Sequence, residues 1–89
     1  MKICFLSGLK EAAGRQELEL EYEGPLSNLL ETLCESQGPD LRGLVMDADD
    51  PGARSSYVKI LVDGRDVRED DPELDGTETV FLFLPIAGG

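Results

Sequence analysis

One apolar stripe, bounded on each side by a glycine–proline pair, most limits what this chain can fold into. Its members recur at i, i+3, i+4, i+7 and i+8, and they are Leu26, Leu29, Leu30, Leu33 and Cys34. That spacing places all of them on one face of an α-helix. Gly24-Pro25 precedes the stripe and Gly38-Pro39 follows it, and such pairs interrupt regular structure. We therefore expect one main helix that must bury its stripe against another element.

The segments before this helix predict two strands. Residues 2–9 are almost all apolar and indicate a first strand. Residues 9–14 indicate a connection that ends in a turn glycine. Over residues 17–23, three apolar residues alternate with four glutamates, which is the period of a strand with one buried face. We expect these two strands to form a hairpin.

The segments after the helix predict further strands. Asp63-Gly64 is a dipeptide typical of hairpin turns. We expect a short helical turn over 40–46, a polar loop over 47–56, a strand over 57–62, a short returning strand over 65–67 and a last strand over 79–84. The first and last strands are the most apolar, so both are expected in the centre of the sheet. If they are neighbours they run parallel, because a helical crossover separates them.

This order of elements predicts an α+β fold, with one main helix on one face of a mixed sheet. The chain has 89 residues, which allows one domain. We assign residues 1–84 to that domain and residues 85–89 to a flexible tail. Neither a signal peptide nor a membrane-spanning stretch is expected, so the predicted location is the cytoplasm. Cys4 and Cys34 fall in apolar patterns and are expected to be buried, reduced thiols.

Composition and residue types exclude several function classes. Nineteen acidic and eight basic residues give a net charge of −11, which disfavours nucleic-acid and membrane partners and favours a basic protein surface, unless the charge serves only solubility. The chain has no histidine and no glycine-rich phosphate loop. Counted from Asp47, a calcium loop would need ligands where Pro51 and Val58 stand. We expect no metal, no cofactor and no catalysis by the chain alone.

The last five residues are the strongest functional signal. Pro85-Ile86-Ala87-Gly88-Gly89 follows the last predicted strand, and a proline there ends the sheet. Two glycines are thin enough to thread a narrow channel in another protein and to present the carboxylate of Gly89. From the residues alone, a frayed terminus without function is an equally good interpretation.

The chain resembles a known family at three segments, which are Val62 to Val67, Leu74 to Val80 and Phe83 to Gly89. These resemble the small sulfur carriers exemplified by the MoaD-like small subunit of molybdopterin synthase, with the thiamine carrier ThiS and ubiquitin as more distant relatives. The sequence departs from the family's usual Asn-Gly turn with Asp63-Gly64, and it has a single proline before the tail. The resemblance implies a ubiquitin-like β-grasp fold.

The resemblance also implies a chemistry for Gly89. An ATP-dependent enzyme of the ubiquitin-activating type would adenylate it, and a sulfur donor would convert it to a thiocarboxylate. The tail, Pro85 to Gly89, would then deliver sulfur inside the large subunit of molybdopterin synthase. The alternatives are a modifier that joins Gly89 to lysines, a thiamine-pathway carrier, and an interaction domain with an idle tail. The sequence does not decide between molybdenum, tungsten, thiamine and tRNA-thiolation pathways.

Alternation along the last strand gives one more expectation. If Val80, Leu82 and Leu84 face the helix-covered core, Phe81 and Phe83 face outward. Phe83 aligns with an interface aromatic of the resembling family, so both phenylalanines are candidate docking residues. The alternative is that the phenylalanines themselves form the core.

Overall fold

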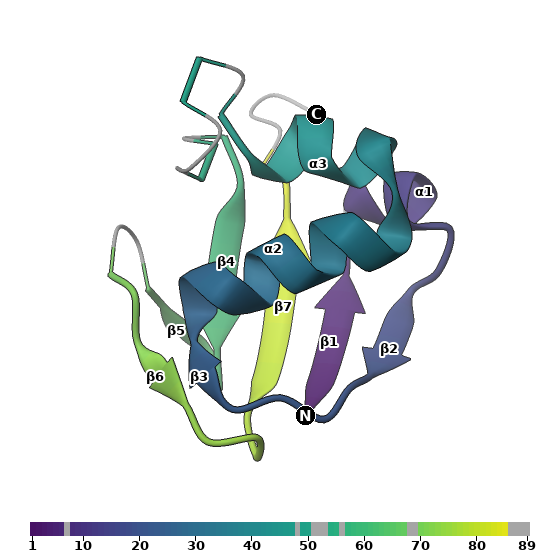
Figure 1. The fold of residues 1–89 in the computed structure, drawn as a ribbon. Coiled ribbons are helices and arrows are strands. Elements are labelled where there is room, and N and C mark those ends of the chain that lie inside the picture. The colour runs from purple at the N-terminus through teal and green to yellow at the C-terminus, as the bar shows by residue number, and fades with distance from the viewer. Residues whose placement is uncertain (7, 48, 51–53, 56, 68–69, 86–89) are drawn as a thin grey trace.

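The protein, seen in a computed structural model, is a mixed sheet with helices on one side; residues 1–6, 8–47, 49–50, 54–55, 57–67 and 70–85 are described. Its strands are β1 (Lys2–Phe5), β2 (Glu17–Glu19), β3 (Gly24–Pro25), β4 (Lys59–Val62), β5 (Arg65–Asp66), β6 (Glu73–Leu74) and β7 (Thr79–Phe83). Its helices are α1 (Leu9–Ala13), α2 (Leu26–Gln37) and α3 (Pro39–Val45). Figure 1 shows α2 lying across one face of the sheet.

Five strands form the main sheet in the order β2-β1-β7-β4-β5. Strands β1 and β7 pair in parallel, with Ile3 opposite Val80, whereas the other neighbours are antiparallel. The last strand of the chain is therefore the central strand, and the first strand lies beside it. This confirms the predicted α+β class and the predicted parallel pairing, which follows from the helical crossover between the two strands.

Helix α2 covers the sheet because its apolar stripe faces inward. All five predicted stripe residues are buried, and none is more than 2% exposed. Complete burial of a leucine side chain contributes roughly 1.5–3 kcal/mol, so the stripe is a main source of stability. After α2, Gly38 has a φ of 106°, a value that favours glycine, and Pro39 begins α3. The short helix predicted over 40–46 is thus confirmed.

The start of α2 is capped from a distant part of the chain. Pro25 stands at the N-cap position and provides no side-chain cap. Instead, Asp71 accepts hydrogen bonds from the backbone N–H of Ser27 at 2.7 Å and from its hydroxyl at 2.8 Å. The carbonyl of Pro72 accepts the N–H of Leu26 at 3.0 Å. These contacts satisfy N–H groups that a helix start leaves without partners.

The first predicted strand and the loop after it need correction. The strand expected over 2–9 ends at Phe5, and residues 9–13, expected as a connection, form helix α1. Leucine, lysine, glutamate and alanine all favour helices, and Gly14 closes this helix with a φ of 75°. A helix of five residues is too short to display the 3.6-residue period that reveals longer ones.

The segment between β1 and α2 also differs from expectation. The predicted strand over 17–23 forms ladder pairs only at β2, residues 17–19, which pair with β1 as a hairpin partner. Gly24-Pro25, expected only to break the chain, pairs with Glu73 and Leu74 in a second, two-stranded sheet. This pairing joins residues about fifty positions apart, so no local pattern in the sequence could indicate it.

The hairpin turn at Asp63-Gly64 is confirmed. Asp63 has a φ of 51° and Gly64 a φ of 84°, as a tight two-residue turn requires. The Asp63 carboxylate accepts the N–H of Thr79 at 2.9 Å, and the Asp63 N–H donates to the Thr79 carbonyl at 2.9 Å. The turn is thereby tied to the first residue of β7. The flanking strands are slightly shorter than predicted, since β4 begins at Lys59 and β5 ends at Asp66, and the last strand, β7, ends at Phe83.

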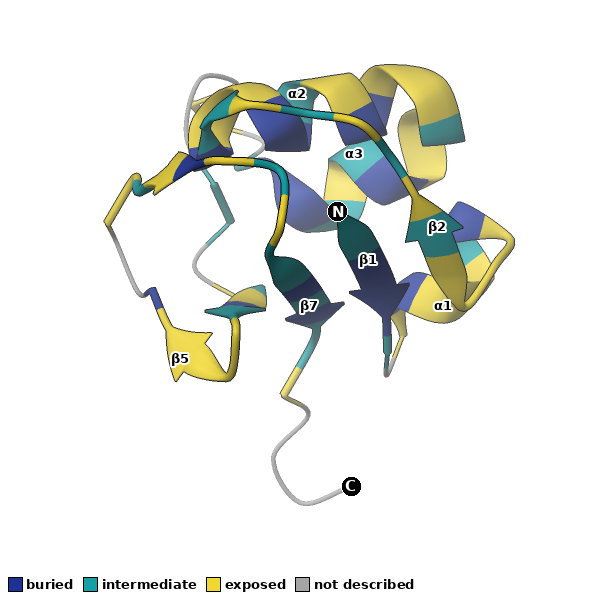
Figure 2. Ribbon diagram, turned by 90° about the horizontal axis from the view of Figure 1, so that it is seen from below, coloured by how far each residue is buried: buried dark blue, intermediate teal, exposed yellow. Residues whose placement is uncertain are grey.

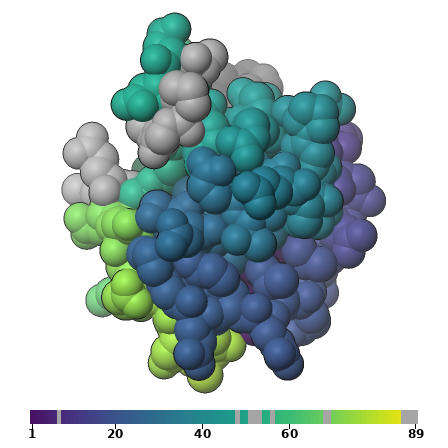
Figure 3. Space-filling model, in the orientation of Figure 1, coloured from purple at the N-terminus to yellow at the C-terminus, as the bar shows by residue number. Residues whose placement is uncertain are grey.

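The core lies between the sheet and the helices. Its most buried large side chains are Ile3, Phe5, Leu9, Leu26, Leu29, Leu30, Leu33, Leu41, Val45, Val80 and Leu82. Figure 2 shows α2 and α3 on the same side of β1 and β7, and Figure 3 shows their side chains closed over that side of the sheet. Within the described part of the chain, no helix combines the length and the apolar character needed to cross a bilayer.

Candidate functional site

Strand β7 presents two different rows of side chains. Val80 and Leu82 are completely buried beneath the helices. Phe81 and Phe83 alternate with them and are only half-buried. The predicted alternation is therefore confirmed, and the two phenylalanines face away from the helix-covered core.

Strand pairing extends the phenylalanines into a larger apolar surface. Phe81 lies opposite Cys4 of β1 on one side and opposite Leu61 of β4 on the other. Leu61 is half-buried, and Cys4 is 6% exposed. Paired residues on neighbouring strands project to the same face of a sheet. Cys4, Leu61, Phe81 and Phe83 together form a surface that we call the open-face strip.

Two ion pairs border the open-face strip. On the β1 side, Lys2 lies 3.5 Å from Glu17, and on the β4 side, Lys59 lies 2.7 Å from Asp66. Solvent-exposed pairs of this kind add at most about 1 kcal/mol each to stability. Their more important effect is local, because each lysine charge beside the apolar strip is balanced by a carboxylate.

The root of the tail lies at one end of the strip. Phe83 belongs to the strip, Leu84 is half-buried against the core, and Pro85 is exposed. The predicted tail residues Ile86, Ala87, Gly88 and Gly89 lie outside the described residues. Of the predicted site residues, Phe81, Phe83 and Pro85 are thus placed by the structure, and they follow one another along β7 and its end.

Neither cysteine is suited to carry sulfur as a reactive thiol. Burial raises the pKa of the Cys4 thiol, and the Glu17 carboxylate raises it further against the opposing effect of Lys2. Burial also raises the pKa of Cys34, which lies on the buried face of α2. The thiolate is the nucleophilic form of cysteine, and a raised pKa makes it scarce at neutral pH.

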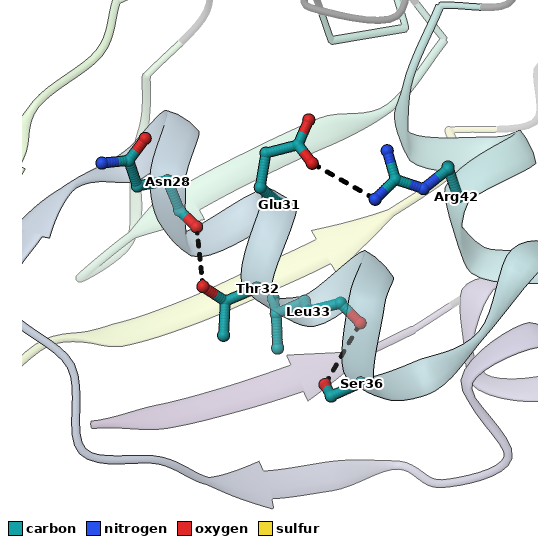
Figure 4. A network of polar contacts seen from close by, with 6 residues as sticks. All are labelled: Asn28, Glu31, Thr32, Leu33, Ser36 and Arg42. Atoms are coloured by element: carbon teal, nitrogen blue, oxygen red, sulfur yellow. Dashed lines mark hydrogen bonds and ion pairs between the residues drawn. The ribbon is translucent and has the colours of Figure 1, made fainter.

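The outer face of the helices is occupied by contacts that hold the fold together (Figure 4). Arg42 of α3 lies 3.2 Å from Glu31 of α2 and ties the two helices to each other. Thr32 donates its hydroxyl to the carbonyl of Asn28 at 2.9 Å, within the same helix. Such contacts satisfy polar groups locally and leave no arrangement of nucleophile and base on this side.

Solved structures with the same architecture identify the fold. The chain aligns with the small archaeal modifier protein 1 (SAMP1) of Methanosarcina acetivorans at a TM-score of 0.83 and 22% identity, over 99% of this chain and 94% of that one. The values for SAMP1 of Haloferax volcanii are 0.79 and 21%, over 100% and 98%. A putative molybdopterin converting factor, subunit 1, from Pyrococcus furiosus gives 0.64 and 25%, over 96% and 95%. The fold is the ubiquitin-like β-grasp.

The resemblance inferred from the sequence is supported by structural likeness and not by sequence matches. No family model matches the chain, and no curated protein sequence matches it. The structural likeness nevertheless covers nearly the whole of this β-grasp chain and nearly the whole of each neighbour. The predicted resemblance to small carriers and modifiers of ubiquitin-like fold is therefore confirmed at the level of the fold.

Two further features of the described surface were compared with the open-face strip, namely clusters of metal-ligand type and a hollow beside Met1. Among the described residues, no group of three or more histidine, cysteine or carboxylate side chains is placed to hold a metal ion. A polar, open hollow lies beside Met1, lined among others by Tyr22 and Thr77. The Tyr22 hydroxyl donates to the carbonyl of Pro25 at 2.6 Å, so this group is already engaged in holding the chain.

Sequence reasoning missed two members of the open-face strip. Cys4 was predicted only as a buried thiol, which its 6% exposure confirms, and Leu61 was given no role, whereas strand pairing brings both beside Phe81. The period of β4 does place Leu61 on the face opposite Ile60. Knowing which residues stand opposite Phe81, however, requires the strand order and register, which no local signal provides.

Proposed function

We propose that this chain is a sulfur carrier that works through a thiocarboxylate on Gly89, with Gly89 as the terminal residue of its active form. The observation that carries the proposal is the Pro85-to-Gly89 segment placed directly after the central strand of a β-grasp sheet. The open-face strip beside the root of this segment supports it, because a partner that receives the tail needs a surface on which to dock. The buried, weakly nucleophilic cysteines also favour a carboxylate as the sulfur-bearing group.

The proposed chemistry needs two steps and a partner enzyme. The Gly89 carboxylate attacks the α-phosphorus of ATP, which forms an acyl-adenylate and releases pyrophosphate. Sulfide then attacks the acyl carbon, a carbon–sulfur bond forms, and AMP leaves with the former carboxylate oxygen. The chain itself supplies the carboxylate and the docking surface and performs no catalysis. The adenylating enzyme supplies the phosphate-binding site that the β-grasp domain does not offer.

Charge and structural likeness indicate the partners. A net charge of −11 favours a basic docking surface on the activating enzyme and raises the rate of encounter with it. For the acceptor, we propose the large subunit of molybdopterin synthase. The support is the 25% identity to a putative molybdopterin converting factor subunit together with the tail. The proposed location is the cytoplasm, where ATP and the reduced sulfur donor are available.

A second candidate is a protein modifier. It is favoured by one observation, that two structural neighbours are named small archaeal modifier protein 1. The first step would be the same adenylation of Gly89. A lysine amine of a target protein, rather than sulfide, would then displace AMP and form an isopeptide bond.

Intact-mass spectrometry tests the proposed function. The purified chain is incubated with ATP, the activating enzyme of its own cell and a sulfide source. We expect a species heavier by the difference between a sulfur and an oxygen atom, and fragmentation should locate that change at Gly89. A control variant that lacks Gly88 and Gly89 should keep the same thermal midpoint and show no change in mass.

Two other outcomes would overturn or redirect the proposal. If neither a mass change nor a trapped adenylate is found, the carrier function fails and the tail has no activated form. If adducts that resist reducing agents accumulate on other proteins while no thiocarboxylate is detected, the modifier function replaces it.

A further inference from the structure

Leu84 is the last residue of the chain that packs on the domain before the tail. Strand β7 ends at Phe83, and Leu84 lies half-buried against the core. The next residue, Pro85, is exposed. Because the proline ring restricts its own φ and the conformation of the residue before it, the direction in which the chain continues is determined at Leu84 and Pro85.

Gly8 forms the surface on which Leu84 packs. A Cβ atom built on Gly8 would stand 3.0 Å from Cδ1 of Leu84 and 3.7 Å from its Cγ. Carbon atoms in optimal contact lie about 3.5–4.0 Å apart, so a side chain at position 8 would force the end of the Leu84 side chain to shift by a few tenths of an ångström. Gly8 also has a φ of 84°, which other residues rarely adopt. Two independent features thus require glycine at this position.

The residues on either side of Gly8 have fixed partners in the fold. The N–H of Leu6 donates to the carbonyl of Leu82 in β7 at 2.9 Å. Leu9, the first residue of α1, is completely buried, and its N–H donates to the carbonyl of Leu6 at 2.8 Å. Gly8 therefore lies next to a buried residue of α1, close to the end of β7.

We infer that Gly8 is a positioning residue for the tail, an inference that rests on the proposed function. By leaving room for Leu84, it lets the last packed side chain seat fully and sets the point at which Pro85 leaves the domain beside the open-face strip. A partner that binds the strip then receives the tail from a defined starting point. Small misplacements of a reacting group are costly, and about 1 Å can reduce a rate by two orders of magnitude.

The chain offers a matched control for a test of Gly8. Gly14, at the other end of α1, has a φ of 75°, yet nothing lies within 4 Å of the Cβ that alanine would add there. Gly14 has a ψ of 12°, within the left-handed region, whereas Gly8 has a ψ of −31°, outside it, so the two alanine variants differ in backbone strain as well as in the contact with Leu84. The double-mutant cycle described next separates these two effects. We expect Gly8→Ala to lower kcat/KM for adenylation of the carrier by about tenfold, and Gly14→Ala by less than about twofold.

A double-mutant cycle with Leu84 checks that the effect passes through this contact. Leu84→Ala removes the anchor and should itself lower kcat/KM, and adding Gly8→Ala to it should cause no further loss, because the contact is already absent. Leu84 lies at the edge of the domain, so its variant remains informative even if Gly8→Ala alone does not fold. Nuclear Overhauser contacts between the Gly8 α-protons and the Leu84 methyls provide a readout that does not depend on activity.

The possible results separate this inference from the proposed function. Equal losses for Gly8→Ala and Gly14→Ala, additive losses in the cycle, or no contact between Gly8 and the Leu84 methyls would each overturn the positioning role while adenylation of the wild-type chain stands. Failure of the wild-type chain to be adenylated would remove the proposed function, and the role of Gly8 with it.

Discussion

The two faces of strand β7 share one backbone, but their side chains differ in burial and in what they contact. On the helix-covered face, Val80 and Leu82 are completely buried and contact a close-packed core. On the open face, Phe81 and Phe83 are half-buried and belong to the open-face strip. These partly exposed apolar side chains stand side by side, and this is where we propose that a partner docks.

The contrast between the two faces of β7 indicates how a small domain can place its proposed function at a surface and a terminus. The buried row of β7 supplies stability, and the open row lies one residue away along the same strand. Because β7 is held on both sides, by β1 and by β4, the open row and the root of the tail keep a fixed relation. A domain of this size has little interior for a catalytic cavity, so function is expected at a surface and a terminus.

Replacement of Leu82 by alanine should give the largest effect on stability. The side chain is completely buried, and removing it leaves a cavity that close-packed neighbours fill only in part. We expect the free energy of unfolding to fall by about 2–5 kcal/mol, as measured by urea denaturation. A loss below about 1 kcal/mol would mean that the core beneath the helices is not packed as described.

Replacement of Phe83 by alanine should weaken partner binding more than it lowers stability. Its ring is only partly buried, so we expect a smaller loss of stability than at Leu82, about 1–2 kcal/mol. Binding to the activating enzyme should weaken at least about tenfold, because aromatic anchors dominate interface energies. Isothermal titration calorimetry at a temperature where both forms are folded measures the difference.

Leu44 provides the matched control for Phe83. It is a partly buried apolar residue on α3, on the helical side of the molecule. Leu44→Ala should leave partner binding within about twofold of the wild type, because no interface is proposed there. Equal loss of binding in both variants, or a collapse of the fold in Phe83→Ala, would contradict a division of roles between the two faces.

Local patterns in the sequence predicted the elements whose signals are long and periodic. The stripe from Leu26 to Cys34 gave α2, and the alternation along residues 79–83 gave the two faces of β7. Asp63-Gly64 gave the hairpin turn because the required φ values favour these two residues. The parallel pairing of β1 with β7 followed from connectivity alone.

The features missed by sequence reasoning all depend on contacts between distant residues. Helix α1 is too short to show its period, and β3 and β6 are strands only because they pair with each other. The cap of α2 by Asp71 joins residues 44 positions apart. For the candidate site, the role of Gly8 depends on the position of Leu84, and only the folded chain brings the two together.

The two cysteines allow a final test of the difference between the faces. Cys4 belongs to the open-face strip and Cys34 lies on the buried face of α2, and burial raises the pKa of both thiols. A raised pKa lowers the thiolate fraction at a given pH, so alkylation by iodoacetamide should be slow for both at pH 8 and should accelerate as the pH rises. Labelled peptides identified by mass spectrometry give the two rates separately.

A partner bound to the strip should change only one of these rates. We expect the activating enzyme to slow alkylation of Cys4 severalfold and to leave that of Cys34 unchanged, because only Cys4 lies beneath the proposed interface. Complete labelling of both cysteines in urea serves as the control for reagent activity. Equal protection of the two cysteines would indicate that the partner reduces local opening of the whole domain. Protection of Cys34 alone would indicate that the partner docks on the helical side.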